Sequence, residues 1–164
     1  MNNPMRILVV EDEKALAHMM AIVLGGPTAK VVRALNGWEA LIKVRVAPRP
    51  FDVVITDHRM PRVGGLELVR RLRAQDFAGK IMVLSAYLSD EDIAAYEALN
   101  VDMMMSKPFD FDELQQAMSV LNRKPSLPPL APSSPLISGT ACARASRWPS
   151  RRRAGRYGGS LSRA

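Results

Sequence analysis

Five short runs of apolar and β-branched residues occur in the chain before residue 124. Each run is apolar at most positions and is bounded by polar residues, Gly or Pro, which is typical of a strand buried on both faces. The runs are residues 6–10 (RILVV), 30–34 (KVVRA), 51–57 (FDVVITD), 80–86 (KIMVLSA) and 101–106 (VDMMMS). We predict a strand at each of them.

Segments with helical character separate these strands. Apolar residues recur at helical spacing from Leu16 to Leu24 until two glycines end the pattern, and residues 65–74 (GLELVRRLRA) are amphipathic. Elsewhere a polar residue precedes an acidic one by three positions, so that its side chain can cap a helix. These pairs are Asn36 with Glu39, as in a capping box, Ser89 with Asp92, and Asp110 with Glu113.

Strands and helices therefore alternate along the chain. This order, with strands that are apolar throughout, predicts an α/β fold: a doubly wound, five-stranded parallel sheet with helices on both faces, of the flavodoxin-like kind. The crossovers should be right-handed. In such sheets a ligand binds outside the carboxyl ends of the strands, near the point where the strand order reverses.

The carboxy-terminal segment differs from this pattern. Pro, Ser, Gly, Ala and Arg dominate residues 125–164, and only five of these 40 residues are Leu or Ile. So little apolar surface does not offset the entropy lost on folding. We therefore expect a short extension at residues 1–4, one folded domain at 5–123 and a disordered Pro/Ser/Arg-rich tail at 124–164.

The charge of the chain is divided unevenly between these segments. Of the 23 Lys and Arg residues, seven arginines lie in 125–164, which has no lysine and no acidic residue. Residues 1–124 therefore hold 16 basic and 16 acidic side chains, and the net charge of +7 belongs to the tail. The high pI does not argue that the folded domain binds nucleic acid.

The sequence shows no signal for membrane insertion or secretion. No apolar run approaches the roughly 20 residues that span a bilayer. The N-terminus lacks the ordered regions of a signal peptide, and the one cysteine, Cys142, has no partner for an internal disulfide. We expect a soluble, cytoplasmic protein.

Several reactive side chains occur where the predicted strands end. Because the carboxyl ends of parallel strands meet at one edge of the sheet, we expect these side chains to converge there. They are Glu11 and Asp12 after the first strand, Asp57 at the end of the third, Ser85 at the end of the fourth and Lys107 after the fifth.

The chemistry of this group indicates phosphoryl transfer. Crowded carboxylates repel one another, and a hard cation such as Mg²⁺ neutralises them in an oxygen-rich site that keeps open water positions. With the metal bound, Asp57 can act as an oxygen nucleophile toward phosphorus and form an acyl phosphate. Mg²⁺ and Lys107 can offset the charge of the transferring group, and the Ser85 hydroxyl can donate a hydrogen bond to it.

Four motifs, taken in order, resemble the receiver domains of bacterial two-component response regulators, in the single-domain, chemotaxis-regulator-like form. The resemblance covers about residues 5–123. Each motif is weak by itself, but each falls at a predicted strand end. The motifs are VVEDE (9–13), DHRMPRVGG (57–65), LSA (84–86) and SKPFD (106–110).

The resemblance implies a role for each site residue. Asp57 would be the phosphorylated aspartate, Glu11 and Asp12 the acidic metal pair, and the backbone carbonyl of Arg59 would complete the protein ligands of Mg²⁺. Asp12 is the likelier direct ligand of the acidic pair in such domains. The phosphodonor would be a phosphohistidine on a sensor histidine kinase or a histidine phosphotransfer protein. The chain would catalyse only its own phosphorylation and dephosphorylation, and would signal through a docking face around its fourth helix, fifth strand and fifth helix.

Three positions bear on how such a domain would switch. Receiver domains usually carry an aromatic residue three positions before the lysine, where this chain has Met104, which argues against an aromatic switch. Bulky residues stand two positions after the aspartate and two after the serine, namely Arg59 and Tyr87. Both can shield an acyl phosphate from water, which predicts slow self-dephosphorylation.

The other notable side chains of the folded domain have simpler interpretations. We expect His58 to be an exposed loop residue and His18 to lie on the surface of the first helix. The three consecutive methionines 103–105 are interpreted as packing residues of the fifth strand and not as a metal site.

Three other functions share part of this pattern. A phosphatase of the haloacid dehalogenase type also places an aspartate at a strand end, but it needs a second aspartate two residues later, where Arg59 stands. A flavodoxin-like cofactor binder needs a phosphate-cradling loop after the first strand, where this chain has the acidic EDEKA (11–15). The third is a receiver-shaped docking module whose site takes no phosphate.

The arginine-rich segment SRRRAGR (150–156) allows two interpretations. It can bind nucleic-acid phosphates, lipid headgroups or an acidic partner by charge, which would make the chain a tail-dependent nucleic-acid-binding regulator. Without interleaved aromatic residues or a helical pattern it cannot read a base sequence. The other interpretation is a dispensable extension, or an out-of-frame product, because GC-rich DNA encodes these residue types in any frame.

Overall fold

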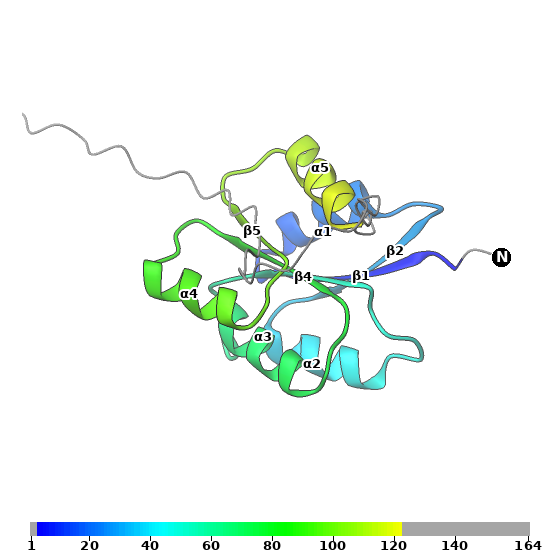
Figure 1. The fold of residues 1–164 in the computed structure, drawn as a ribbon. Coiled ribbons are helices and arrows are strands. Elements are labelled where there is room, and N and C mark those ends of the chain that lie inside the picture. Colours follow the sequence, from blue (N-terminus) through cyan, green and yellow to red (C-terminus); the bar gives the residue numbers. More distant parts are fainter. Residues whose placement is uncertain (1–2, 123–164) are drawn as a thin grey trace, which may run out of the picture.

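A five-stranded parallel sheet forms the centre of the molecule (Figure 1). The computed structural model describes residues 3–122, so the predicted tail lies outside the described residues. The strands stand in the order β2-β1-β3-β4-β5, and the order reverses between β1 and β3. Their bounds are β1 (Met5–Val10), β2 (Ala29–Ala34), β3 (Val53–Asp57), β4 (Lys80–Ser85) and β5 (Met103–Ser106).

Five helices cover the two faces of this sheet. Helices α1 and α5 lie on one face, and α2, α3 and α4 lie on the other (Figure 1). The predicted doubly wound α/β fold with helices on both faces is therefore confirmed for the described residues. The helices are α1 (Lys14–Leu24), α2 (Gly37–Val46), α3 (Gly65–Ala74), α4 (Asp90–Ala98) and α5 (Phe111–Asn122).

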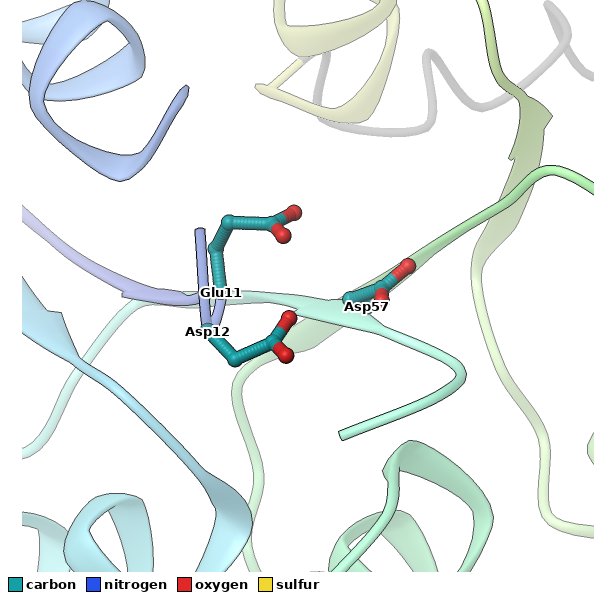
Figure 2. Close-up of side chains that lie close together, drawn as sticks. All are labelled: Glu11, Asp12 and Asp57. Carbon is teal, nitrogen blue, oxygen red and sulfur yellow. The ribbon is translucent and has the colours of Figure 1, made fainter. Parts of the chain in front are cut away.

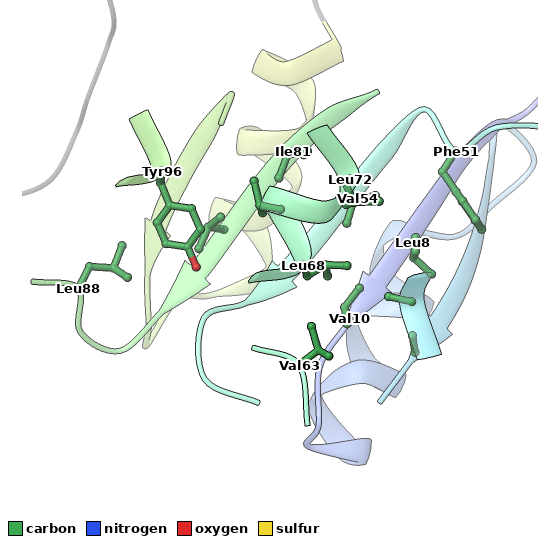
Figure 3. Close-up of a cluster of buried hydrophobic side chains, with 14 residues drawn as sticks. Leu8, Val10, Phe51, Val54, Val63, Leu68, Leu72, Ile81, Leu88 and Tyr96 are labelled. Carbon is green, nitrogen blue, oxygen red and sulfur yellow. The ribbon is translucent and has the colours of Figure 1, made fainter. Parts of the chain in front are cut away.

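Each face of the sheet has its own hydrophobic core, because successive side chains of a strand point to opposite faces. In β1, Ile7 and Val9 pack on the α1 and α5 side, whereas Leu8 and Val10 pack on the side of α2, α3 and α4 (Figure 3). All four side chains are buried. Burial on both faces explains why the strands are apolar at consecutive positions.

Two strands begin later than the sequence predicts, and an aspartate marks each start. Residues 51–52 and 101–102 precede β3 and β5 instead of belonging to them. The Asp52 carboxylate accepts the backbone N–H of Arg6 at 2.7 Å, and the Asp102 carboxylate accepts that of Ile81 at 2.9 Å. A side chain thus takes the acceptor place that a strand carbonyl would fill, and regular pairing starts only after it.

The predicted helix caps form, with one difference. Ser89 and Asp92 make a reciprocal capping box at α4. At α2, Asn36 accepts the backbone N–H of Glu39 at 2.9 Å, but the Glu39 carboxylate accepts the N–H of Leu35 at 2.8 Å and not that of Asn36. The capping box predicted there is therefore only half formed, and the second acceptor satisfies the residue before the cap instead.

Candidate functional site

Three carboxylates meet at the carboxyl edge of the sheet, at the point where the strand order reverses. Glu11 and Asp12 follow β1, and Asp57 is the last residue of β3 (Figure 2). One oxygen from each carboxylate lies within 4.8 Å of the others. Glu11 and Asp57 are only 2% and 9% exposed, whereas Asp12 is exposed. The site is therefore buried on one side and open to solvent on the other.

Lys107 brings a positive charge into this cluster. Its Nζ lies 2.6 Å from Glu11 Oε2 and 3.1 Å from Asp57 Oδ1. The residue follows β5, and its backbone N–H donates to the Ser85 carbonyl at 2.8 Å, which ties it to the end of β4. Since Lys107 follows β5, its ammonium group connects the end of β5 with the ends of β1 and β3.

The electrostatics of this ion pair reflect its partial burial. Burial raises the pKa of the Glu11 carboxyl, because desolvation disfavours its charged form, and the hydrogen bond and charge of Lys107 offset only part of this effect. Burial by itself lowers the pKa of Lys107, but Glu11 and then Asp57 outweigh it and hold this pKa above its ordinary value. Lys107 is therefore a cation at neutral pH.

Ser85 lies beside Asp57 with its hydroxyl already engaged. The side chain is buried, and its Oγ donates to the Tyr87 carbonyl at 2.6 Å and accepts the Tyr87 N–H at 3.2 Å. Ser85 and Tyr87 line a small pocket of about 160 Å³ together with Asp57, Arg59 and Lys107. The hydroxyl would have to rotate away from Tyr87 to donate to a group held in this pocket.

The three methionines of β5 pack in both cores, as predicted. Met104 is half-buried against the core under α2, α3 and α4, and Met103 and Met105 pack on the α1 and α5 side. The thioether of Met104 thus occupies the position where receiver domains usually carry an aromatic switch residue.

His18 is exposed, as predicted.

The prediction that His58 is an exposed loop residue is wrong. Its side chain is 12% exposed, and its Nδ1 lies 2.8 Å from the Tyr96 hydroxyl oxygen. The alternation of side chains along β3 indicates where His58 points. Asp57 shares a side of the sheet with Ile55, so the side chain of the next residue, His58, points to the opposite side, under α4. Extending the period-two pattern one residue past the strand would have found this position.

The oxygen cluster suits a divalent cation of small radius. Mg²⁺ prefers oxygen ligands, carboxylates among them, and usually keeps several waters. One oxygen from each of the three carboxylates lies within 4.8 Å of the others, so these side chains would hold one such ion between them. Asp12 is exposed, which leaves the water positions that Mg²⁺ usually keeps.

Comparison with known proteins identifies the class. The response regulator receiver domain family matches residues 7–119, and the chain belongs to this family. The protein therefore contains a response regulator receiver domain of two-component systems, in which response regulators work with histidine kinases. Receiver domains are not enzymes in the conventional sense.

Individual relatives and solved structures agree with this class. The chain is 34% identical to the two-component response regulator PhoP of Pseudomonas aeruginosa over 122 residues, which is 74% of this chain and 53% of that protein. It is 38% identical to the response regulator MprA of Mycobacterium sp. (strain KMS) over 136 residues, 82% of this chain and 57% of that one. The chain thus spans about half the length of these curated relatives.

Among solved structures, the chemotaxis response regulator CheY4 of Vibrio cholerae matches with a TM-score of 0.66 and 28% identity, covering 73% of this chain and 99% of that one. The Francisella response regulator 1452 receiver domain matches with a TM-score of 0.63 and 30% identity, covering 73% of this chain and 96% of that one.

Within residues 3–122, no helix is long and apolar enough to cross a membrane.

Proposed function

We propose that this protein is a phosphoacceptor response regulator that takes a phosphoryl group on Asp57. The donor is a phosphohistidine of a sensor histidine kinase or a histidine phosphotransfer protein, and the receiver domain extends over residues 5–123 of a cytoplasmic chain. The observation that carries the proposal is the position of Lys107 Nζ, 3.1 Å from Asp57 Oδ1 and 2.6 Å from Glu11 Oε2, beside an acidic cluster of metal-binding geometry.

The transfer is an in-line displacement at phosphorus. An oxygen of Asp57 forms a bond to the phosphorus as the bond between phosphorus and the histidine nitrogen breaks, and the electron pair of that bond returns to the imidazole. Lys107 stands beside the attacking carboxylate and stabilises the charge on the phosphoryl oxygens. The Ser85 hydroxyl, released from the Tyr87 carbonyl, donates to the same oxygens.

Glu11, Asp12 and Asp57 would hold Mg²⁺ together with the backbone carbonyl of Arg59. When bound, the metal supplies positive charge to the phosphoryl oxygens and reduces the repulsion between the carboxylates. Arg59 and Tyr87 flank the pocket that receives the phosphoryl group, and their bulk restricts the access of water to the acyl phosphate. The modified domain then signals through a protein-docking face formed by α4, β5 and α5.

Intact-mass spectrometry tests this proposal directly. The wild-type chain, incubated with acetyl phosphate and Mg²⁺, is expected to gain the mass of one phosphoryl group, and Asp57→Asn is expected to gain none. Chelation of Mg²⁺ should abolish the adduct in the wild type, because Lys107 alone then has to offset both the carboxylates and the phosphoryl oxygens.

A matched control uses an aspartate at another edge of the sheet. Asp76 is exposed between α3 and β4 and has a φ of 55°, a conformation that asparagine accepts readily. Asp76→Asn should therefore take the phosphoryl group like the wild type. A wild-type chain that shows neither adduct nor Mg²⁺ binding would refute the proposal and favour a receiver-shaped docking module.

A further inference from the structure

His58, the residue after the proposed phosphoacceptor, contacts α4 at two points. Its Nδ1 lies 2.8 Å from the Tyr96 hydroxyl oxygen, and its Nε2 lies 3.7 Å from Asp92 Oδ2. The two rings meet edge to face, with centroids 5.7 Å apart. Asp92 and Tyr96 are four positions apart and so lie on one face of the helix, which lets the histidine span the first two turns of α4.

The backbone of His58 is held firmly at the end of β3. Its N–H donates to the Leu84 carbonyl and its carbonyl accepts the N–H of Gly65, both at 2.9 Å. The Asp57 side chain lies in the acidic cluster, and the next side chain points to the opposite side of the sheet. A shift of the peptide between Asp57 and His58 therefore moves both side chains together.

Helix α4 has few other anchors to the sheet. Tyr96 is its one buried residue, whereas α3 buries four and α1 and α5 bury three each. The ring of Tyr96 packs in the core beside the sheet, near Leu88 (Figure 3). Its hydroxyl is a buried polar group, and His58 provides the hydrogen bond that such a group requires. Ile93 also packs against this core but is only partly buried, so Tyr96, whose polar end is bound next to Asp57, is the main buried anchor of α4.

We infer that the His58–Tyr96 hydrogen bond links the phosphorylation site to α4, and that His58 is the positioning residue that makes α4 respond to a phosphoryl group on Asp57. This inference rests on the proposed function. Phosphorylation changes the charge at Asp57 from −1 to about −2 and adds three oxygens, and the peptide that must accommodate them also carries His58. The link is additional to the covalent one, in which the loop after Ser85 leads directly into Ser89 at the start of α4.

Hydrogen–deuterium exchange of the full chain tests the link, with the amides of residues 90–98 as the readout. Tyr96→Phe removes one hydroxyl and keeps the buried ring, and His58→Leu removes the other partner. Each is expected to speed α4 exchange at rest about fivefold, as the loss of one hydrogen bond predicts. Because both changes break the same bond and His58→Leu also removes the contact with Asp92, the double variant should exchange no faster than His58→Leu.

The phosphorylated state supplies the second comparison. With acetyl phosphate and Mg²⁺, α4 exchange in the wild type should change, and Tyr96→Phe should lose this change although its mass still shows the adduct on Asp57. The control is His18→Leu, which removes an exposed histidine bound to Arg33 and should match the wild type in both states.

The outcomes separate the link from the proposed function. Wild-type α4 exchange in Tyr96→Phe at rest, additive effects in the double variant, or an undiminished response to phosphorylation in Tyr96→Phe would each overturn the link. So would a wild-type adduct that leaves α4 exchange unchanged. If the wild type takes no phosphoryl group, the proposed function fails, and the resting comparison of single and double variants alone decides whether His58 holds α4.

Discussion

Gly65, the first residue of α3, has no room for a side chain. A Cβ at this position would lie 2.3 Å from the Asp57 carbonyl oxygen and 3.0 Å from the His58 Cα. Both neighbours are backbone atoms, so relief of the contact would move the peptide that carries Asp57. This close approach explains why position 65 holds a glycine, which has no Cβ.

Gly65→Ala is therefore expected to reduce the free energy of unfolding by about 2 kcal/mol, in the range found for overpacked sites. Chemical denaturation measures the loss. Gly26→Ala is the control, because a Cβ there meets nothing within 4 Å and should change the stability by less than about 0.5 kcal/mol. Equal stabilities of the two variants would show that the backbone around residue 65 moves aside without a loss of unfolding free energy.

Asp92 connects the charge of one residue to the stability of α4. The Ser89 side chain and backbone both donate to this carboxylate and hold its pKa below the usual value of 3.8. A carboxylate with a lowered pKa in the folded state stabilises the fold above the unfolded-state pKa, and this contribution disappears as the pH falls through the folded-state pKa.

We expect Asp92→Asn to be less stable than the wild type at pH 7, by about 1 kcal/mol as for the loss of a helix cap. The difference should shrink once the pH falls below 3.8. Urea denaturation of both proteins across this range measures it. In a Ser89→Ala background the same substitution should cost less, because the side-chain donor that lowers the pKa of Asp92 is gone and only the backbone N–H of residue 89 remains. A difference that is constant with pH would contradict this account.

At the scale of elements, Arg73 joins the end of α3 to the segment between α4 and β5. Its guanidinium donates to the carbonyls of Phe77 at 2.7 Å, Asn100 at 2.9 Å and Leu99 at 3.2 Å, and its Nη2 lies 3.4 Å from Asp102 Oδ2. Asp102 in turn marks the start of β5. The planar group thus satisfies backbone acceptors of two loops at once.

Arg73→Met should cost about 2 kcal/mol of unfolding free energy, because it leaves several partly buried carbonyls without a donor. Arg70→Met lies on the same helix and removes only an exposed pair with Glu67, which is worth less than about 1 kcal/mol. Denaturation midpoints of both variants test this contrast. If Arg70→Met is as damaging as Arg73→Met, the contacts of the guanidinium do not explain its contribution.

At the scale of the whole molecule, the division of charge bears on which segment carries the signal. Residues 1–124 are formally neutral, and the seven arginines of 125–164 hold the whole excess of positive charge. The described residues place the candidate site entirely within the part before residue 123.

We expect a chain that ends at residue 124 to form the phosphoryl adduct at about the same rate as the full chain, because every residue assigned to the candidate site precedes residue 123. Mass spectrometry over time measures both rates. If deletion abolishes a phosphorylation-dependent signal while the adduct still forms, the output lies in the tail and the nucleic-acid-binding alternative gains support.

The sequence by itself determined the fold class and the members of the candidate site. The hydrophobic pattern depends only on neighbouring residues. Apolar runs such as residues 6–10 predict buried strands, and the residues around Asp57 alone predict that it ends a strand. Because parallel strands end at a common edge, the prediction of a parallel sheet was enough to bring Glu11, Asp57 and Lys107 to one place.

Only the tertiary structure decided which of these groups touch and which are held elsewhere. It placed Lys107 between two carboxylates 50 and 96 positions away, engaged the Ser85 hydroxyl with the Tyr87 carbonyl, and buried His58 against Tyr96, 38 positions along the chain. Such contacts depend on the distance and orientation of whole elements, set by the packing of both cores. A local pattern gives at most the side of the sheet to which His58 points and not its partner.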